Sequence, residues 1–315
     1  IRPTSGRKVV VATNVAETSI TIDGVRAVID SGLARVARFD PHRGINTLYV
    51  EPISQAAAEQ RAGRGGRTAP GRCLRLWTAQ EHRGRAAHEV PEIRRIDLAE
   101  IFLILKAQGI ADMRTFPWLE APTEPAIIRA EQLLCDLGAA DPATGQITEL
   151  GQRMVSFPVQ PRYARMLMAG HTYGCTREAP LIAALTQTQD VLVRRPPRHI
   201  QEDRERVLGD RSDSDFFILM LAWRYAQQHG YRLDACQRLA IHAGAARQVT
   251  PLFQQFLHVA ALQGLTINEH SASQEAIRHC ILTAFIDQLA LRRDEGTLRC
   301  DLVHGRRGEL ARDSA

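Results

Sequence analysis

The 315-residue sequence has few of the residues that mark disulfide-stapled, metal-bound or membrane-spanning proteins. Its six cysteines include no CxxC pair and no close Cys/His cluster, so no zinc site is predicted and a reducing, cytoplasmic setting is favoured. No apolar run approaches the roughly 20 residues that a membrane-spanning helix needs. Aromatic residues make up only 5% of the chain, which argues against a platform that stacks nucleic-acid bases.

Lysine is almost absent as well, because Lys8 and Lys106 are the only lysines among 40 basic residues. The chain still has a net charge of +5, which permits a polyanionic partner. A skew toward arginine also arises from genomic base composition, so charge alone does not identify the partner. The sequence begins with Ile1 rather than Met and has no secretory signal, from which we expect an N-terminus created by truncation.

The first 90 residues have the pattern of a parallel α/β layer. The β-branched run Lys8 to Thr13 predicts a strand buried on both faces, and further short strands are predicted at Ala27 to Asp30 and at Cys73 to Trp77. Three strands with one intervening helix are too few for a layer covered by helices on both faces. We therefore expect part of this domain to precede Ile1.

A β-hairpin is predicted between the strands at Ala27 to Asp30 and Cys73 to Trp77. The segments Ala34 to Phe39 and Ile45 to Val50 are apolar or alternating, and they flank Asp40-Pro41-His42-Arg43-Gly44. Proline and glycine supply the backbone dihedrals of a turn there. The hairpin should project from the sheet.

The pattern becomes helical after Asp97. Apolar residues recur at spacings of three and four up to Gly109, and a second helix is predicted from Glu124 to Leu137. The stretch Ala139 to Thr148 has turn residues between short extended pieces. Two helices followed by a hairpin predict a small winged-helix domain.

A helical bundle is predicted over residues 161–284, because apolar residues recur there with helical periodicity. The segment Arg194 to Arg198 contains paired prolines and should form a loop within the bundle. Leu298 to Val303 predicts a strand in a last β-unit that ends unfinished at Ala315. With a length of 315 residues, two to four domains are expected.

The most informative stretch is Gln60-Arg61-Ala62-Gly63-Arg64-Gly65-Gly66-Arg67. On a helix, arginines three apart lie roughly along one face, and glycines let another domain or a phosphate approach the backbone. A row of planar, permanently charged guanidinium groups suits the charge of a transferring γ-phosphoryl group. The alternative is a Gly/Arg-rich loop that makes surface salt bridges or a non-specific polyanion patch.

A second stretch, Ala12-Thr13-Asn14-Val15-Ala16-Glu17-Thr18-Ser19-Ile20-Thr21-Ile22-Asp23-Gly24, follows the first predicted strand. In open α/β sheets, ligands bind beyond the carboxyl ends of the strands. Hydroxyls and amides there can donate to phosphates, and the carboxylate of Asp23 could orient a ribose or a metal-bound water. The alternative is a polar connection that caps a helix with Ser or Thr.

In this order, the two stretches resemble motifs V and VI of superfamily 2 helicases, and their wording resembles the DEAH-box branch, in its bacterial HrpA/HrpB-like group. The resemblance continues through SGLARVARFDPHRGINTLYVEPIS, PEIRRIDLAEIFLILKAQGI and SDSDFFILMLAWRY. It implies a multidomain fold with a partial α/β RecA-like domain at residues 1–90, which carries the hairpin. A winged helix at 91–160, a helical ratchet domain at 161–284 and the start of an OB-fold at 285–315 would follow.

The resemblance also implies residue roles. Gln60, Arg64 and Arg67 match motif VI positions that contact ATP phosphates, with the two arginines as finger residues. Ser19, Thr21 and Asp23 match positions of motif V near the nucleotide. Thr13 and Asn14 match positions near the RNA backbone, Arg43 lies at the tip of the hairpin that is thought to separate strands, and no residue is assigned to a metal.

The phosphate loop GxxxxGK[ST] and the tetrapeptide Asp-Glu-Ala-His are both absent from the sequence. The lysine and carboxylate that phosphoryl transfer requires are therefore missing. We expect ATP with Mg²⁺ to be held mainly by an N-terminal RecA-like domain, and this chain alone to be inactive.

Other candidate residues favour a structural role. His171, His199, His229 and His242 show no HExxH-type pairing with a carboxylate, so no metal role is predicted. Trp118, Trp223 and Phe253 could stack on bases, but aromatic residues at helical spacing are more often core. Arg194, Arg195 and Arg198 could touch phosphate, although a solvated run of charge is the commoner outcome.

The function that the resemblance implies is that of an ATP-driven 3′-to-5′ RNA helicase, monomeric and acting on single-stranded RNA through its backbone. Two alternatives stay open. A truncated product could keep the winged helix, the bundle and the OB piece as a non-catalytic nucleic-acid-binding scaffold. A DNA-directed motor is equally compatible with a protein that reads the phosphate backbone.

Overall fold

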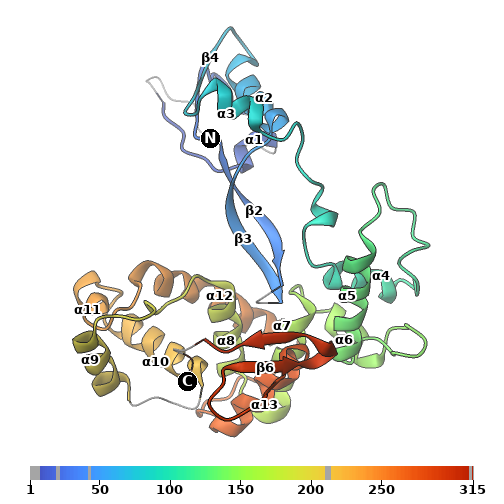
Figure 1. Ribbon diagram of the computed structural model, residues 1–315, viewed down its shortest axis with the longest axis vertical. Coiled ribbons are helices and arrows are strands. Elements are labelled where there is room, and N and C mark those ends of the chain that lie inside the picture. The colour runs from blue at the N-terminus through green and yellow to red at the C-terminus, as the bar shows by residue number, and fades with distance from the viewer. Residues whose placement is uncertain (1–7, 19–21, 42–43, 210–213, 312–313, 315) are drawn as a thin grey trace. The chain divides into compact units, whose positions relative to one another are not determined.

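The computed structural model describes residues 8–18, 22–41, 44–209, 214–311 and 314. The chain divides into two compact units (Figure 1). The first comprises residues up to Asp97 together with 118–126, and the second comprises residues 98–117 and those from Ile127 onward.

The first unit contains a small parallel sheet, a long hairpin and short helices. Strand β1 pairs in parallel with β4, from Ala27 opposite Arg72 to Asp30 opposite Arg75. The elements of this unit are α1 (Val15–Thr18), β1 (Ala27–Asp30), β2 (Leu33–Asp40), β3 (Ile45–Pro52), α2 (Gln55–Gly63), η1 (Arg64–Gly66), β4 (Arg72–Arg75), α3 (Ala79–Gly84) and η2 (Glu92–Arg94).

The strand predicted at Lys8 to Thr13 is wrong. These residues have no regular structure and are exposed, with Val11 95% exposed. A strand needs a neighbour that exchanges backbone hydrogen bonds with it, and no strand in the described part of the chain pairs with residues 8–13. The strands predicted at Ala27 to Asp30 and Cys73 to Trp77 do form, as β1 and β4, but Asp30 is the only fully buried residue in β1.

The predicted hairpin is confirmed. Strands β2 and β3 pair antiparallel from Leu33 opposite Pro52 to Asp40 opposite Ile45. On one face, the Arg38 guanidinium donates to both carboxylate oxygens of Glu51, at 2.6 and 2.8 Å. This hydrogen bonding holds the pKa of Glu51 below its ordinary value.

The second unit opens with the predicted helix, helix and hairpin. The elements are α4 (Ala99–Ala107), α5 (Glu124–Asp136) and α6 (Glu149–Val155), with an antiparallel bridge between Ala140 and Ile147. Lys106 is buried, and its Nζ donates to the carbonyl oxygens of Ala111, at 2.8 Å, and Gly145, at 2.6 Å. The ammonium group thus ties the hairpin turn to the end of α4, which confirms the arrangement expected of a winged helix.

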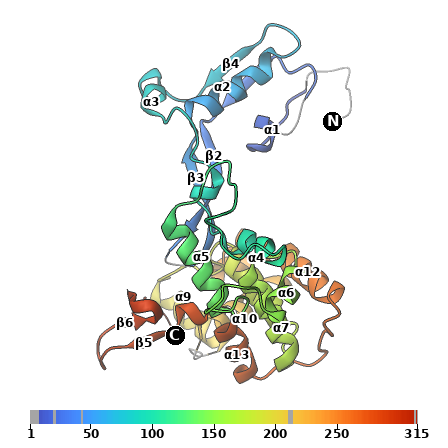
Figure 2. The same cartoon turned by 90° about the vertical axis from the view of Figure 1, so that its right-hand side faces the viewer.

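The predicted bundle is also confirmed. Its elements are α7 (Pro161–Tyr173), α8 (Glu178–Gln187), α9 (Arg198–Leu208), α10 (Asp215–Gln228), α11 (Leu233–Arg238), α12 (Ala243–Leu262) and α13 (Gln274–Ala284), and Figure 2 shows them from a second side. Residues 194–197 of the proline segment precede α9 as a loop, and Arg198 is the first residue of the helix. Trp223 and Phe253 are buried in the core, as their helical spacing predicted.

A buried arginine connects the bundle to the segment that follows it. Arg162, near the start of α7, donates to the carbonyl oxygen of Ala284 at 2.6 Å and to both carboxylate oxygens of Asp287, at 2.5 and 3.0 Å. Asp287 lies in η3 (Ile286–Gln288), which leads into the strands β5 (Ala290–Arg292), β6 (Arg299–Leu302) and β7 (Arg307–Glu309), with η4 (Val303–Gly305) before the last strand. These strands form an antiparallel sheet in the order β5-β6-β7.

All six cysteines have free thiols. None of the helices in the described part of the chain combines the length and apolar character needed to cross a lipid bilayer.

We expect Gly71→Ala to destabilise the first unit. A Cβ atom at this position would lie 1.9 Å from the carbonyl oxygen of Gly65 and 2.8 Å from that of Arg26, and backbone atoms yield little. The expected loss is about 1–3 kcal/mol in free energy of unfolding, measured by urea denaturation. Gly84→Ala is the matched control, because nothing lies within 4 Å of its Cβ position. Equal stability of the two variants would contradict this packing.

Candidate functional site

Helix α2, which carries the arginine-rich stretch, begins at a side-chain cap. The Ser54 hydroxyl accepts a hydrogen bond from the backbone N–H of Ala57 at 3.1 Å. Ala57 and Ala58 are buried with Ile53, and the small alanine side chains let the helix lie close to the sheet. The sequence between Ser54 and Ala58 therefore fixes both the start and the inner face of the helix.

A distant segment satisfies the remaining free N–H groups at the start of α2. The backbone N–H of Ser54 donates to the Glu89 carboxylate at 2.8 Å, and the N–H groups of Gln55 and Ala56 donate to the carbonyl oxygens of Ala86, at 2.8 Å, and Ala87, at 3.0 Å. The first N–H groups of a helix have no partner within it. The segment 86–89 supplies those partners and fixes the helix end.

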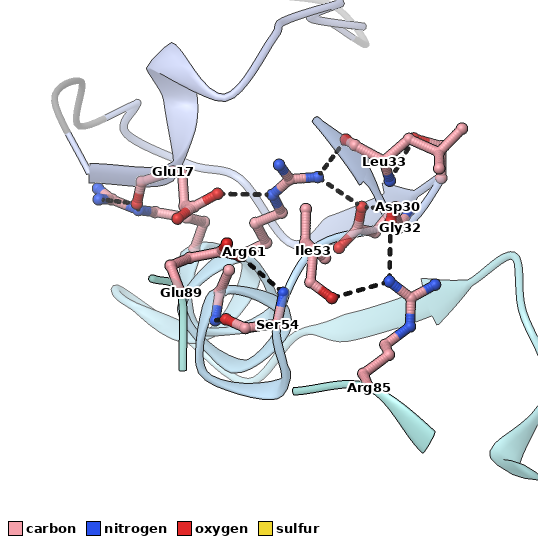
Figure 3. A network of polar contacts seen from close by, with 12 residues as sticks. Glu17, Asp30, Gly32, Leu33, Ile53, Ser54, Arg61, Arg85 and Glu89 are labelled. Atoms are coloured by element: carbon pink, nitrogen blue, oxygen red, sulfur yellow. Dashed lines mark hydrogen bonds and ion pairs between the residues drawn. The ribbon is translucent and has the colours of Figure 1, made fainter. Parts of the chain in front are cut away.

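Arg85 secures the same region from the strand side. Its guanidinium donates to the carbonyl oxygens of Gly32, at 2.8 Å, and Ile53, at 2.9 Å (Figure 3). It also lies over the ring of Trp77, with 4.3 Å from its central carbon to the ring centroid. The start of β2 and the start of α2 are thereby held by one side chain.

Arg61 is the centre of a largely buried ion network. Its Nε donates to the Glu17 carboxylate at 2.9 Å and its terminal nitrogen to the Asp30 carboxylate at 3.0 Å, with a further bond to the Leu33 carbonyl oxygen at 3.1 Å (Figure 3). The side chains of Arg61 and Asp30 are only 14% and 2% exposed. Because a buried carboxylate without a counter-charge is costly, Asp30 depends on this arginine.

Glu17 joins the two motif-like stretches through two different groups. Its carboxylate accepts from Arg61, and its backbone carbonyl oxygen accepts from Arg64, whose Nε lies at 2.8 Å. These contacts span 44 and 47 positions of the sequence. The stretch that contains α1 and the stretch at the end of α2 therefore form one site.

The arginine row does not present a single uniform face. Arg61 points into the protein toward Glu17 and Asp30, Arg64 is half-buried against the Glu17 carbonyl oxygen, and Arg67 is exposed. Gln60 is also exposed. The reason for the inward turn of Arg61 is the buried carboxylate of Asp30, which the sequence pattern alone does not reveal.

The glycines of the stretch also differ in their surroundings. A Cβ atom on Gly65 would lie in ordinary van der Waals contact with Val28 Cγ2, at 3.4 Å, and with the Arg72 carbonyl oxygen, at 3.5 Å, so this buried glycine lies against β1 and β4. At Gly63 and Gly66 nothing lies within 4 Å of that position. These two glycines leave open space beside Arg64 and Arg67.

The residues predicted from the other stretch are less well placed by the structure. Thr13 and Asn14 are exposed, and their carbonyl oxygens accept from the N–H groups of Ala16, at 3.2 Å, and Glu17, at 2.9 Å. Asp23 is exposed in a turn before β1. Ser19, Thr21 and Arg43 lie outside the described residues.

The arrangement therefore combines a buried, charged scaffold with an open cationic edge. Glu17, Asp30 and Arg61 form the scaffold. Sequence reasoning assigned no role to Glu17 or Asp30, and it placed Arg61 in the row of arginines expected to face a phosphate, whereas Arg61 points inward. The sequence did contain a signal for their pairing, namely the acidic residue Glu17 in one stretch and the arginine Arg61 in the other. Opposite charges that are withdrawn from water tend to pair. Gln60 and Arg67 remain accessible to an anionic ligand.

Comparison with protein families places three domains along the chain. Residues 2–69 match the helicase conserved C-terminal domain, residues 130–159 the winged-helix part of the helicase-associated domain HA2, and residues 160–229 the ratchet-like part of HA2. Both stretches described above, residues 12–24 and 60–67, fall within the first match.

Individual proteins are similar over nearly the whole chain. The ATP-dependent RNA helicase HrpA of Escherichia coli (strain K12) is 34% identical over 298 residues, which cover 91% of this chain and 23% of that protein. The pre-mRNA-splicing factor ATP-dependent RNA helicase prp22 of Schizosaccharomyces pombe is 33% identical over 92% of this chain and 25% of its own length. This chain thus spans about a quarter of the length of these curated relatives.

A solved structure is similar as well. The crystal structure of the E. coli DExH-box NTPase HrpB matches 100% of this chain and 33% of its own chain, with 30% sequence identity and a TM-score of 0.58. The similarity therefore covers the helical unit and the hairpin as well as the two motif stretches.

We expect Arg61→Ala to destabilise the first unit strongly. The substitution leaves the buried Asp30 carboxylate without its counter-charge, which costs about 3 kcal/mol or more. The measurement is the free energy of unfolding at neutral pH. Glu59→Gln, on the same helix, breaks the ion pair with Arg75, but Glu59 is 67% exposed. This control should change stability by less than about 1 kcal/mol. If the two variants were equally stable, Arg61 would not hold this site together.

Proposed function

The chain belongs to the DEAH-box helicase family as its C-terminal region, and on that premise we propose that it forms the second half of an ATP-driven motor that unwinds or remodels RNA. The single observation that carries the proposal is the junction at Glu17, where the motif V stretch and the motif VI helix meet. A helicase motor has to couple nucleotide and nucleic acid, and this junction joins the stretch assigned to each.

Residues at the open cationic edge would bind the ATP phosphates. Gln60 and Arg67 are exposed, and the open space at Gly63 and Gly66 admits a phosphate or a facing domain. Arg64 is oriented by the Glu17 carbonyl oxygen. The guanidinium groups of Arg64 and Arg67 would stabilise the charge of the transferring γ-phosphoryl group across a cleft. Ser19, Thr21 and Asp23 would lie near the nucleotide, while Mg²⁺ and most of the ATP would be held by a first RecA-like domain.

RNA would be bound through its backbone. Thr13 and Asn14 are exposed beside α1, and the β2–β3 hairpin, with Arg43 at its turn, would separate strands. Contacts to phosphates carry no sequence information and are screened by salt. Binding should therefore be strongly salt-dependent and nearly independent of sequence. RNA as the substrate and translocation in the 3′-to-5′ direction rest on the family resemblance alone.

The division of labour among the domains follows the predicted boundaries. Residues 1–90 would supply the motor face, and residues 91–160, 161–284 and 285–315 would enclose the RNA strand as winged helix, ratchet and OB-fold start. The protein would act as a monomer in the bacterial cytoplasm. Without a phosphate loop or an Asp-Glu-Ala-His motif, this chain by itself should not hydrolyse ATP.

We expect Arg67→Ala in a complete enzyme to lower ATP turnover by about a thousandfold and to change RNA affinity little. The side chain is exposed, so the loss should reflect charge stabilisation rather than folding. Arg64→Ala should lower turnover at least as much, because it also removes the bond to Glu17. Turnover is measured as phosphate release with saturating RNA, and affinity as fluorescence anisotropy of a labelled RNA strand.

Arg83→Ala is the matched control, because Arg83 is an exposed arginine on α3 outside both motifs. It should hydrolyse ATP at the parent rate. Parent-like hydrolysis by Arg67→Ala as well would contradict the assignment, whereas an RNA affinity that falls in step with turnover would point to an RNA-binding role for this arginine.

A further inference from the structure

The half of the β2–β3 hairpin nearest its turn is hydrogen-bonded to a distant segment of the chain. The Arg95 guanidinium donates to the carbonyl oxygen of Ala37 at 3.0 Å, and the Arg95 carbonyl oxygen accepts from the backbone N–H of Phe39 at 2.7 Å. The backbone N–H of Asp97 donates to the side-chain oxygen of Asn46 at 2.7 Å. The two bonds that involve side chains span 58 and 51 positions of the sequence. These three bonds are called the clamp below.

The clamp contacts both strands of the hairpin at one level. Phe39 lies opposite Asn46, and only the pair of Asp40 with Ile45 lies between them and the turn. Backbone groups two positions apart on a strand point to the same side, so Ala37 and Phe39 are contacted along one edge of β2. The clamp therefore holds the hairpin beside its turn, at the end opposite to the pair of Leu33 with Pro52 where β2 begins.

The segment that supplies the clamp has local structure of its own. It follows η2, and the N–H groups of Arg95 and Ile96 donate to the Glu92 carbonyl oxygen, at 3.0 and 3.2 Å. Asp97 is the last residue of this stretch in the first unit, and Leu98 begins the second unit. The clamp is thus formed where the chain passes from the first unit to the second.

Arg95 is directed at the hairpin rather than at solvent. It is half-buried, and its Nε is inaccessible to solvent. The pKa of Glu51 in β3 is held low mainly by the hydrogen bond from Arg38, and the positive charge of Arg95 adds to this effect. The guanidinium of Arg95 therefore interacts with both strands.

Packing alone gives the hairpin little rigidity. A two-stranded hairpin is at best marginally stable by itself in water. In β3, Leu48 and Val50 are 62% and 63% exposed, so their side chains contribute little to fixing the strand. Hydrogen bonds to the segment 95–97 supply part of the rigidity that packing does not.

From these contacts we propose that Arg95 and Asn46 are positioning residues for strand separation. The inference rests on the proposed function, in which the hairpin separates RNA strands. A separating element has to keep its place when a duplex is driven against it, because a hairpin that bends lets ATP be hydrolysed without parting base pairs. The clamp fixes the hairpin beside its turn. Loss of the clamp uncouples strand separation from ATP hydrolysis, since the residues proposed to act on ATP lie around the end of α2 and not on the hairpin.

The test compares strand separation with ATP turnover in a complete enzyme. Arg95→Ala removes the bond to Ala37, and Asn46→Leu removes the acceptor of the Asp97 N–H at similar side-chain volume. Each variant should separate about fivefold fewer duplexes per ATP hydrolysed, because one net hydrogen bond changes an equilibrium by about that factor. For Arg95→Ala, ATP turnover and affinity for single-stranded RNA should equal those of the parent. Separation is measured as release of a labelled strand, and turnover as phosphate release.

Arg94→Ala is the matched control. Arg94 is the neighbouring arginine, but its side chain is 46% exposed and forms an ion pair with Glu120 at 3.6 Å. This variant should separate as many duplexes per ATP as the parent. A parent-like ratio in Arg95→Ala as well would overturn the proposal, even if its melting temperature fell, because the clamp would then only stabilise the fold. A ratio that falls in step with RNA affinity would overturn it too, because Arg95 would then be an RNA-binding residue.

Hydrogen exchange of this chain tests the clamp without the motor. Arg95→Ala and Asn46→Leu should each raise the exchange rate of the Phe39 amide about fivefold, whereas Arg94→Ala should not change it. Unchanged exchange in the first two variants would overturn the proposal. Failure of the proposed function has a different signature, since the complete parent enzyme would then separate no duplex. Failure of this inference alone leaves the parent active and makes the Arg95→Ala and Asn46→Leu variants equal to it.

Discussion

The carboxylate of Asp30 sets the geometry of the first unit. It lies at the end of β1, its side chain is 2% exposed, and its counter-charge is Arg61 at 3.0 Å. Since an ion of this kind is unfavourable in a protein interior without a partner, α2 must bring Arg61 to the end of β1. The same guanidinium then has a second nitrogen available for Glu17, and this fixes α1 as well. One arginine therefore positions two segments that are far apart in the sequence.

This constraint explains why neighbouring arginines of one motif differ in role. Arg61 forms an ion pair with Asp30 inside the scaffold, Arg64 is aligned by the Glu17 carbonyl oxygen, and Arg67 lies at the surface. A ligand that contacts Arg64 meets a guanidinium group that the Glu17 carbonyl oxygen already orients, so little side-chain entropy is lost there on binding. Preorganised charge of this kind is the main way in which phosphoryl-transfer motors stabilise a transition state.

Local patterns predicted much of the fold, because they rest on interactions between residues close in sequence. The hairpin over 33–52, the helices of the winged-helix segment and bundle, and the proline loop before α9 all formed as expected. The strand at Lys8 to Thr13 did not, because a strand is stabilised by a neighbour that its own residues cannot specify. The inward turn of Arg61 also depends on a distant partner, the Asp30 carboxylate, and it became visible only in the structure. The family resemblance supplied roles for exposed residues, whereas it gave none to the buried ones that hold them.

The central claim is that Glu17 and Arg61 act together to position the motif residues. A double-mutant cycle in a complete enzyme tests it directly, with ATP turnover measured for Glu17→Gln, Arg61→Gln and the double variant. We predict that Glu17→Gln slows turnover about tenfold or more, that Arg61→Gln slows it further because it also removes the partner of Asp30, and that the double variant is no slower than Arg61→Gln alone. If the two effects multiplied instead, the residues would act independently and the proposed coupling of the two motifs through this ion pair would be wrong.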